Sequence, residues 1–247
     1  MKRYLLLIML VVMISQSAVC ETLAVTVPKE AAYFDDAVFI GDSVGNQLRH
    51  YILNLRKEGN EVLGDAQFLT AGAYTVYLAS RNFIPKDMPA LQYRGRAVTV
   101  RDGLIALNPG KVFIMLGLAD EPGRDVDRDI GSYRKLINII RDAVPDIKIT
   151  AMSVTPITKS GEGGLLKQSN INLFNKHLEA FCEEEGIGYV DVASWLKNDH
   201  GFLNSEYSND KKVHLNQHGI KLVVQALHYY AAEQMELEAR LAETAGE

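Results

Sequence analysis

The stretch AVFIGDS, residues 37–43, decides the fold of this 247-residue chain. Its first four residues are a compact apolar run, and residues 47–55, just beyond it, carry apolar side chains at helical spacing. An apolar run, a glycine turn and an amphipathic segment predict a buried strand, a sharp turn and a helix. The turn would place the Ser43 hydroxyl at the start of that helix, where free backbone N–H groups face a developing oxyanion.

The same alternation of apolar runs and helical patterns continues along the chain. Four more buried strands are expected, at residues 67–69, 111–116, 148–154 and 188–192. Helical patterns lie between them, and a last helix begins at residue 217 and ends rich in Glu and Ala. Strands that alternate with helices predict an α/β fold with a five-stranded parallel sheet covered on both faces.

Residues 77–102 show no clear periodicity. We expect them to form a long loop over the active face, because long loops of this kind tend to carry function.

The first 20 residues have the layout of a secretory signal. Lys2 and Arg3 precede an apolar run, residues 4–14, and small and polar residues follow up to Cys20. An uncleaved anchor is the alternative, but the run is well short of the roughly 20 residues that a spanning helix needs. We therefore expect a signal peptide over residues 1–20 and a secreted or otherwise extracytoplasmic protein, in the periplasm or cell envelope.

The remaining chain, residues 21–247, is expected to form a single domain with a helical tail at about residues 233–247. Its formal net charge changes from −5 to −7 when Lys2 and Arg3 leave with the signal. Such an acidic protein has no electrostatic basis for binding nucleic acid or anionic lipid. A neutral substrate is expected, with no nucleic-acid partner and no stable membrane insertion after signal cleavage. Cys182 would be the one remaining cysteine, which predicts a packed core thiol and no intramolecular disulfide.

A serine nucleophile needs a base, and His214 lies in a loop just before the last predicted helix. Asp210, four residues earlier, is placed to turn back onto the imidazole, fix its tautomer and stabilise the imidazolium while the other ring nitrogen takes the serine proton. Asp191, at the end of the fifth predicted strand, is the second candidate acid. The remaining histidines fit less well, because they lie in predicted helices or in other loops: His50, His177, His200, His218 and His228.

With the serine near its amino terminus and an Asp–His pair before its last helix, the chain resembles the SGNH (GDSL-type) hydrolases, in their bacterial exported branch, over about residues 36–232. Four family blocks have counterparts here: Gly41-Asp42-Ser43, Gly72, Gly117-Leu118-Ala119-Asp120, and Asp210 with His214. The resemblance implies a three-layer flavodoxin-like fold, no cofactor, and hydrolysis of small acyl esters, often acetyl groups on carbohydrate or cell-envelope polymers.

The resemblance also assigns an oxyanion hole, and here the chain departs from the family. The backbone amides of Ser43 and Gly72 carry over, but Ala119 stands where the family has an asparagine side chain. Loss of one such donor typically costs about 100- to 1000-fold in rate. The sequence thus indicates an ester hydrolase of reduced activity acting on an acylated carbohydrate or small ester. A non-catalytic glycan-binding member of the fold and an O-acyltransferase are the alternatives. The acid also lies one residue further from His214 than is usual, with Lys211 in the customary place.

Two other motifs favour structural roles. Asp125, Asp127 and Asp129 alternate as at the start of a calcium loop, but neither the glycine nor the final glutamate of that loop follows, so no metal site is expected. The glycine-rich residues 161–164 lack the Gly-Lys-Ser/Thr ending of a phosphate loop and are expected to form a flexible loop bordering the active face.

Overall fold

The computed structural model describes residues 28–120, 122 and 125–245 of the chain. Its central sheet holds five parallel strands in the order β2-β1-β5-β6-β7. Their bounds are Ala37–Gly41 (β1), Gln67–Thr70 (β2), Lys111–Met115 (β5), Lys148–Met152 (β6) and Gly188–Val190 (β7). The chain places β2 on one side of β1 and the later strands on the other, so strand order reverses between β1 and β5. This is the flavodoxin-like order, in which ligands bind at the carboxyl ends of the strands beside the reversal.

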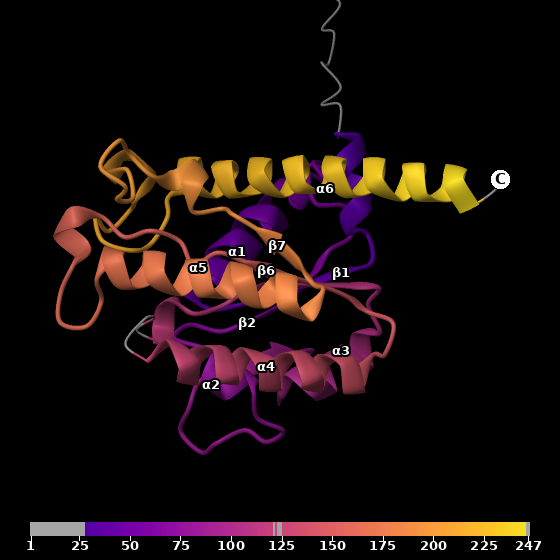
Figure 1. Ribbon diagram of the computed structural model, residues 1–247, viewed down its shortest axis with the longest axis horizontal. Coiled ribbons are helices and arrows are strands. Elements are labelled where there is room, and N and C mark those ends of the chain that lie inside the picture. The colour runs from indigo at the N-terminus through magenta and orange to yellow at the C-terminus, as the bar shows by residue number, and fades with distance from the viewer. Residues whose placement is uncertain (1–27, 121, 123–124, 246–247) are drawn as a thin grey trace, which may run out of the picture.

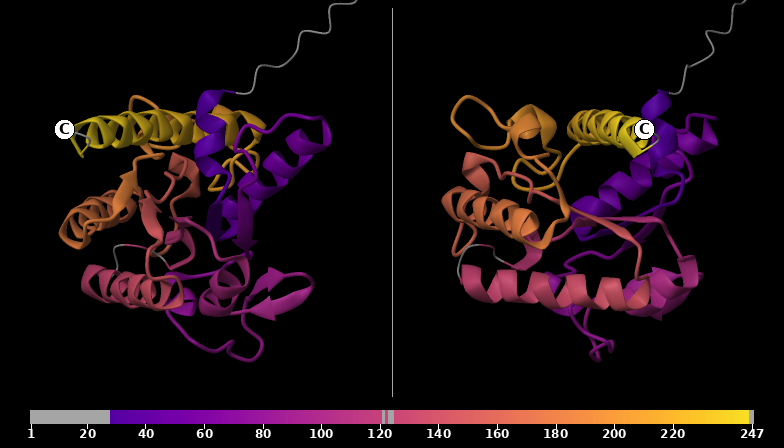
Figure 2. Two further views of the ribbon diagram at one scale, coloured as in Figure 1. Left: turned by 90° about the vertical axis from the view of Figure 1, so that its right-hand side faces the viewer. Right: turned by 45° about the vertical axis from the view of Figure 1, so that its right-hand side comes forward.

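Helices cover both faces of the sheet, which makes three layers (Figures 1 and 2). One face is covered by the short helix η1 (Lys29–Phe34), α1 (Ser43–Lys57) and α6 (Gln217–Ala245). The other is covered by α2 (Val76–Ala79), α3 (Val100–Leu107), α4 (Val126–Ala143) and α5 (Gln168–Glu185). The fold class predicted from the sequence is confirmed.

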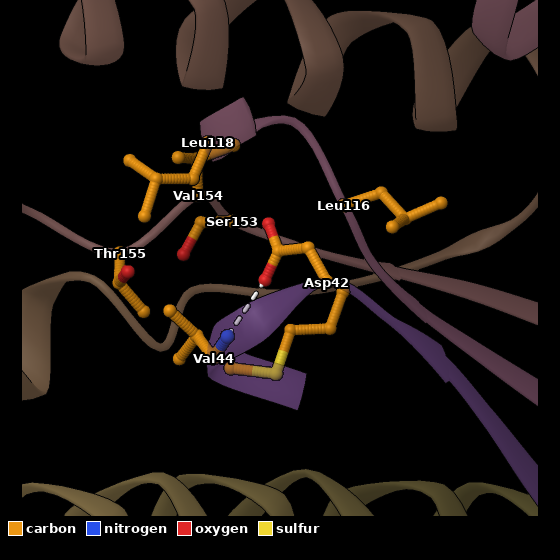
Figure 3. A pocket seen from close by; sticks show the side chains of 8 residues that line it. Asp42, Val44, Leu116, Leu118, Ser153, Val154 and Thr155 are labelled. Atoms are coloured by element: carbon orange, nitrogen blue, oxygen red, sulfur yellow. Dashed lines mark hydrogen bonds between the residues drawn. The ribbon is translucent and has the colours of Figure 1, made fainter. Parts of the chain in front are cut away.

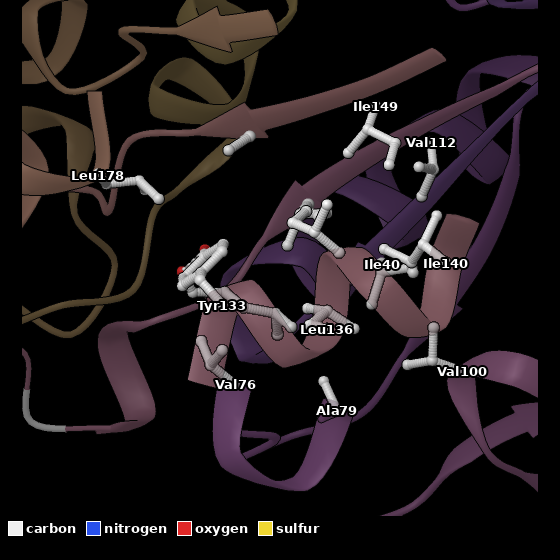
Figure 4. Packing of buried hydrophobic residues seen from close by; sticks show 14 of the residues in the cluster. Ile40, Val76, Ala79, Val100, Val112, Tyr133, Leu136, Ile140, Ile149 and Leu178 are labelled. Atoms are coloured by element: carbon white, nitrogen blue, oxygen red, sulfur yellow. Dashed lines mark hydrogen bonds between the residues drawn. The ribbon is translucent and has the colours of Figure 1, made fainter. Parts of the chain in front are cut away.

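The two hydrophobic cores follow from the pleat of the strands, whose successive side chains point to opposite faces. In β1, Phe39 packs with the α1 and α6 core, whereas Ile40 packs with the core under α4. Figure 4 shows Ile40 and Val112 of neighbouring strands facing Leu136 of α4. All of these side chains are fully buried, so every residue of β1 is enclosed between helical layers.

The expectation of a plain loop over residues 77–102 is wrong. This segment contains the antiparallel hairpin of β3 (Leu91–Tyr93) and β4 (Arg96–Val98), and it ends in the first turn of α3. The hairpin turn consists of Arg94 and Gly95, both with positive φ (49° and 75°). A two-residue turn with positive φ at both positions matches the twist of paired strands, which explains why so short a hairpin forms here.

Two predictions from the sequence concern the ends of the chain, a signal peptide at the start and a helical tail at the end. The predicted signal peptide, residues 1–20, lies outside the described residues. The Glu- and Ala-rich end of the chain continues α6 as a helix up to Ala245. Among the helices of the described residues, none is long and apolar enough to cross a membrane.

Candidate active site

Ser43 is the first residue of α1 and follows β1 at the point where strand order reverses. The preceding Asp42 caps this helix, since its Oδ1 accepts a hydrogen bond from Val44 N–H at 2.9 Å. The turn is tight because Gly41 and Gly45 approach closely: a Cβ built on Gly41 would lie 2.8 Å from the Gly45 Cα. The strand-turn-helix expected from the sequence is therefore present, with Ser43 half-buried at its tip.

His214 and Asp210 reach Ser43 from a loop 171 residues further along the chain. His214 Nε2 lies 3.1 Å from Ser43 Oγ, and His214 Nδ1 lies 2.7 Å from Asp210 Oδ2. Nδ1 donates to the carboxylate when Nε2 is the nitrogen that accepts the serine proton. The structure thus brings together the three residues that the sequence suggested, in one hydrogen-bonded line.

Asp210 is held as a carboxylate by the loop around it. Burial opposes its ionisation, but the hydrogen bonds from the His214 ring and from three successive backbone N–H groups outweigh that effect. These N–H groups belong to residues 212–214 and all point to Asp210 Oδ1, at 2.8, 3.0 and 3.2 Å. Together they hold the pKa of Asp210 well below its usual range, so the group stays charged beside the imidazole.

The additional residue between acid and base, Lys211, takes a left-handed conformation with φ 57°. Its carbonyl accepts hydrogen bonds from the hydroxyls of Thr158 and Ser160, and the Lys212 carbonyl accepts one from Thr158 N–H at 2.8 Å. The short helix η3 (Lys159–Gly161) packs so closely that a Cβ on Gly161 would lie 2.8 Å from the Lys212 carbonyl oxygen. Residues 158–161, the last of which is the first glycine of the glycine-rich segment, therefore support the loop that carries the acid and the base.

A second support, Gln47, was not found from the sequence. It lies one helical turn after Ser43 on α1, and its side chain spans to Leu215, the residue that follows His214. Its Nε2 donates to the Leu215 carbonyl at 2.8 Å, and its Oε1 accepts from Leu215 N–H at 3.0 Å. The helix that carries the nucleophile thus also holds the backbone next to the base.

The other residues that the sequence assigned to an oxyanion hole follow the ends of two strands. Gly72 follows β2 and is exposed, and Ala119 lies in the short helix η2 (Leu118–Asp120) after β5. Ala119 is half-buried and has no polar side-chain atom, so it offers no side-chain donor at the position where the sequence comparison expected an asparagine. The neighbouring Asp120 has another role, because its carboxylate accepts from the N–H groups of Val76 and Tyr77 at the start of α2.

Two carboxyl groups with a raised pKa interact on this side of the site: Asp42, which is buried and precedes Ser43, and Asp120, which is half-buried. Burial raises the pKa of Asp42 to about 6 and that of Asp120 to about 7. Asp42 also borders a small cavity of about 10 Å³, which is roughly the space of one water molecule. Figure 3 shows the Asp42 carboxylate, the Ser153 hydroxyl and the Thr155 hydroxyl around this cavity.

The other candidates from the sequence lie away from this line. Asp191 accepts from the Ser153 hydroxyl and from Ser194 N–H, each at 3.2 Å, rather than from His214. Cys182 is buried in the core, and burial raises the pKa of its thiol to about 12, as suits a packed thiol. Asp125 caps α4 and Asp129 pairs with Arg128, so these aspartates stabilise a helix start. No cluster of potential metal ligands occurs among the described residues.

Comparison with known proteins shows the family and the fold that the chain shares. Residues 39–222 match the model of the GDSL-like lipase/acylhydrolase family. A GDSL-like lipase from Bacteroides thetaiotaomicron is similar in structure, with a TM-score of 0.58 and 16% identity over 80% of this chain and 88% of that one. A carbohydrate esterase family 3 protein from Talaromyces cellulolyticus gives a TM-score of 0.56 and 17% identity, over 81% and 98% of the two chains.

An acetyl xylan esterase has the same TM-score of 0.56 and 17% identity, over 77% of this chain and 96% of that one. At these identities the likeness shows a shared fold. A search of the curated proteins found no match.

Proposed function

The chain belongs to the GDSL-like lipase/acylhydrolase family of ester hydrolases, and we propose that it hydrolyses small O-acyl esters, most simply O-acetyl esters, on carbohydrate or cell-envelope substrates outside the cytoplasm. The observation that carries this proposal is the hydrogen-bonded line from Ser43 Oγ through His214 to Asp210, with distances of 3.1 and 2.7 Å. The carbohydrate part is supported by two proteins of the same fold, a carbohydrate esterase and an acetyl xylan esterase. The location is supported by the signal-like residues 1–20.

In the proposed cycle, His214 Nε2 takes the proton of Ser43 Oγ as that oxygen attacks the ester carbonyl. The carbonyl oxygen becomes an oxyanion that the backbone N–H groups of Ser43 and Gly72 stabilise. The imidazolium then gives its proton to the leaving alcohol, and an acyl group remains on Ser43. A water molecule, deprotonated by His214, releases the acid and restores the serine. Asp210 stays ionised throughout, since its pKa is held well below its usual range.

One observation favours a second candidate, a glycan-binding protein that does not cleave its ligand. Ala119 removes the side-chain donor of the oxyanion hole, which corresponds to a loss of about 3 to 4 kcal/mol of transition-state stabilisation. Two backbone donors and an intact base would still leave measurable catalysis, because the remaining parts of such a site each contribute.

The test is hydrolysis of 4-nitrophenyl acetate and of acetylated xylan by the purified protein. We expect turnover that falls to background in both Ser43→Ala and His214→Ala. If the wild-type protein matches the Ser43→Ala background on both substrates while it still binds the glycan, the binding role replaces the hydrolytic one. Mass spectrometry of the products with an added sugar alcohol separates hydrolysis from acyl transfer, since a transferase would move the acetyl group to that sugar.

A further inference from the structure

A groove of about 540 Å³ runs along α1 away from Ser43, between that helix and the β3–β4 hairpin. Its near end is formed by Asn46 and Thr70, whose side chains share a hydrogen bond of 3.1 Å. Asn46 lies three residues after Ser43, and Thr70 lies two residues before Gly72, so this end adjoins the oxyanion side of the active site. Its far end reaches Arg56, which is about 15 Å further along the helix at 1.5 Å per residue.

The groove is basic although the chain is acidic. Four of its lining residues are basic and none is acidic: Arg49, His50, Arg56 and Arg94. Arg56 is committed to the fold, because it donates to the carbonyls of Gly64 and Ala66. Arg49 and Arg94 take part in no ion pair among the residues that the structure describes. Their charges are therefore available to a ligand, in a protein whose formal net charge is −5.

The rest of the lining suits a sugar chain. Gln67 and Gln92 are exposed amides that offer both donors and acceptors to hydroxyl groups. Tyr93 adds an aromatic ring, and the Arg94 guanidinium lies 5.2 Å from its centre. An aromatic ring with flanking amides offers an apolar surface and hydrogen bonds together, as a sugar ring requires.

We propose that this groove binds anionic sugar units, bearing carboxylate or phosphate groups, that lie next to the acylated unit in the glycan substrate. The proposal rests on the proposed function, because it takes the ester to be at Ser43. Arginine is suited to this role, since its planar fork matches the two oxygens of a carboxylate or a phosphate. The acidic surface elsewhere would repel such a polymer, so the groove would also set the direction in which the chain lies. This proposal differs from the expectation of a neutral substrate, which rests on the total charge of the chain and not on the charges that line the groove.

The test compares three O-acetylated substrates: an oligogalacturonide with carboxylates, a polymer with phosphodiester links, and a neutral xylo-oligosaccharide. We expect the wild-type protein to have a lower KM for one of the two anionic substrates than for the neutral one. Arg49→Gln and Arg94→Gln should each raise that KM about 10-fold, as loss of a charge-assisted hydrogen bond does. Hydrolysis of 4-nitrophenyl acetate should stay unchanged in both variants, because neither arginine touches the reacting atoms.

The matched control is Arg96→Gln, which removes an exposed arginine from the same hairpin but outside the groove. Equal KM values for all three substrates, or the same KM increase in Arg96→Gln as in the groove variants, would overturn the proposal. Calorimetric binding of the deacetylated anionic polymers to Ser43→Ala gives a readout without turnover. If the wild-type protein hydrolyses none of the esters, the proposed function fails. Binding that disappears in the combined Ser43→Ala, Arg49→Gln variant would still support the groove, and absence of binding would reject it.

Discussion

Replacement of Gln47 by leucine should slow catalysis as well as destabilise the fold, because the side chain links the helix of the nucleophile to the loop of the base. Leucine has a similar size but makes neither of the two hydrogen bonds, at 2.8 and 3.0 Å, that Gln47 forms with the backbone of Leu215. The substitution would leave the N–H and the carbonyl of Leu215 without these partners. The loss of two neutral hydrogen bonds lowers the free energy of unfolding by about 2 to 3 kcal/mol. For a chain of this size that loss lowers Tm by about 5 to 10 °C.

The effect on rate follows from the position of Leu215 directly after His214. The 3.1 Å separation of His214 Nε2 and Ser43 Oγ depends on α1 and the base loop keeping their relative position, and Gln47 is the side chain that links them. A misplacement of about 1 Å in such a pair costs on the order of 100-fold. We therefore expect Gln47→Leu to lower kcat for 4-nitrophenyl acetate by about 10- to 100-fold with little change in KM.

Asn175 provides a matched control, because its side chain makes the same pair of bonds elsewhere in the fold. It accepts from Val154 N–H at 2.8 Å and donates to the Val154 carbonyl at 2.9 Å. Asn175→Leu should cost at least as much stability, since this pair is fully buried, yet retain most of kcat. Both variants would be assayed well below their Tm, determined by thermal unfolding. If kcat falls equally in the two variants, or stays at the wild-type value in Gln47→Leu, Gln47 does not position the base.

Three further predictions concern the oxyanion hole, the support of the base loop and the carboxyl group of Asp120. Ala119→Asn should raise kcat for 4-nitrophenyl acetate, by up to about 100-fold, by supplying the missing donor; an unchanged or lower kcat would show that the alanine is no defect. Gly161→Ala should reduce kcat/KM about 10-fold, because the new Cβ would lie 2.8 Å from the Lys212 backbone and displace the loop of the base. Gly163→Ala is the control and should behave as wild type, because its Cβ would meet nothing within 4 Å. Burial raises the pKa of Asp120 to about 7, so its protonation stabilises the fold below about pH 4 and that contribution is lost as pH rises through about 7. Urea unfolding at several pH values should show that the free energy of unfolding falls between about pH 4 and pH 7 by about 2 to 4 kcal/mol more in the wild type than in Asp120→Asn. The same pH dependence in both proteins would contradict the raised pKa.

The parts of the site that could be predicted from the sequence are those with a local pattern. Ser43 follows an apolar run and a glycine turn, and this pattern, together with the alternation of strands and helices, predicts a hydroxyl at the carboxyl end of a parallel strand. His214 and Asp210 lie four residues apart in the loop before the last helix, so their hydrogen bond is a local contact that could be predicted from the spacing. The contact of Ser43 with His214 spans 171 residues, and it was inferred because nucleophile and base must meet for the chemistry to work.

The parts that could not be predicted depend on contacts without a local signature. Gln47 resembles any polar residue on a helix surface, and only the folded structure shows that it meets Leu215 across 168 residues. Residues 91–98 were missed as a hairpin because each strand has only three residues, too few for an alternating pattern. The Arg94-Gly95 pair was the available sequence signal for this hairpin turn. The basic groove beside the hairpin was also missed, because the net negative charge of the whole chain does not show where basic residues gather.

The sequence differs at two places from the family pattern that it resembles, and we expect these two differences to have different consequences. The extra residue between acid and base is absorbed by Lys211, whose left-handed backbone costs about 1 kcal/mol. That turn lets three successive N–H groups converge on Asp210 Oδ1, and it leaves Oδ2 at 2.7 Å from His214 Nδ1. The hydrogen bonds gained offset the strain, so the longer spacing keeps the carboxylate aligned with the imidazole. The change at Ala119 differs from that at Lys211, because no backbone adjustment can give a methyl side chain a hydrogen-bond donor. Any deficit in rate relative to the family should therefore arise at the oxyanion and not at the base, and it should appear in kcat without a shift in the pH dependence of kcat/KM.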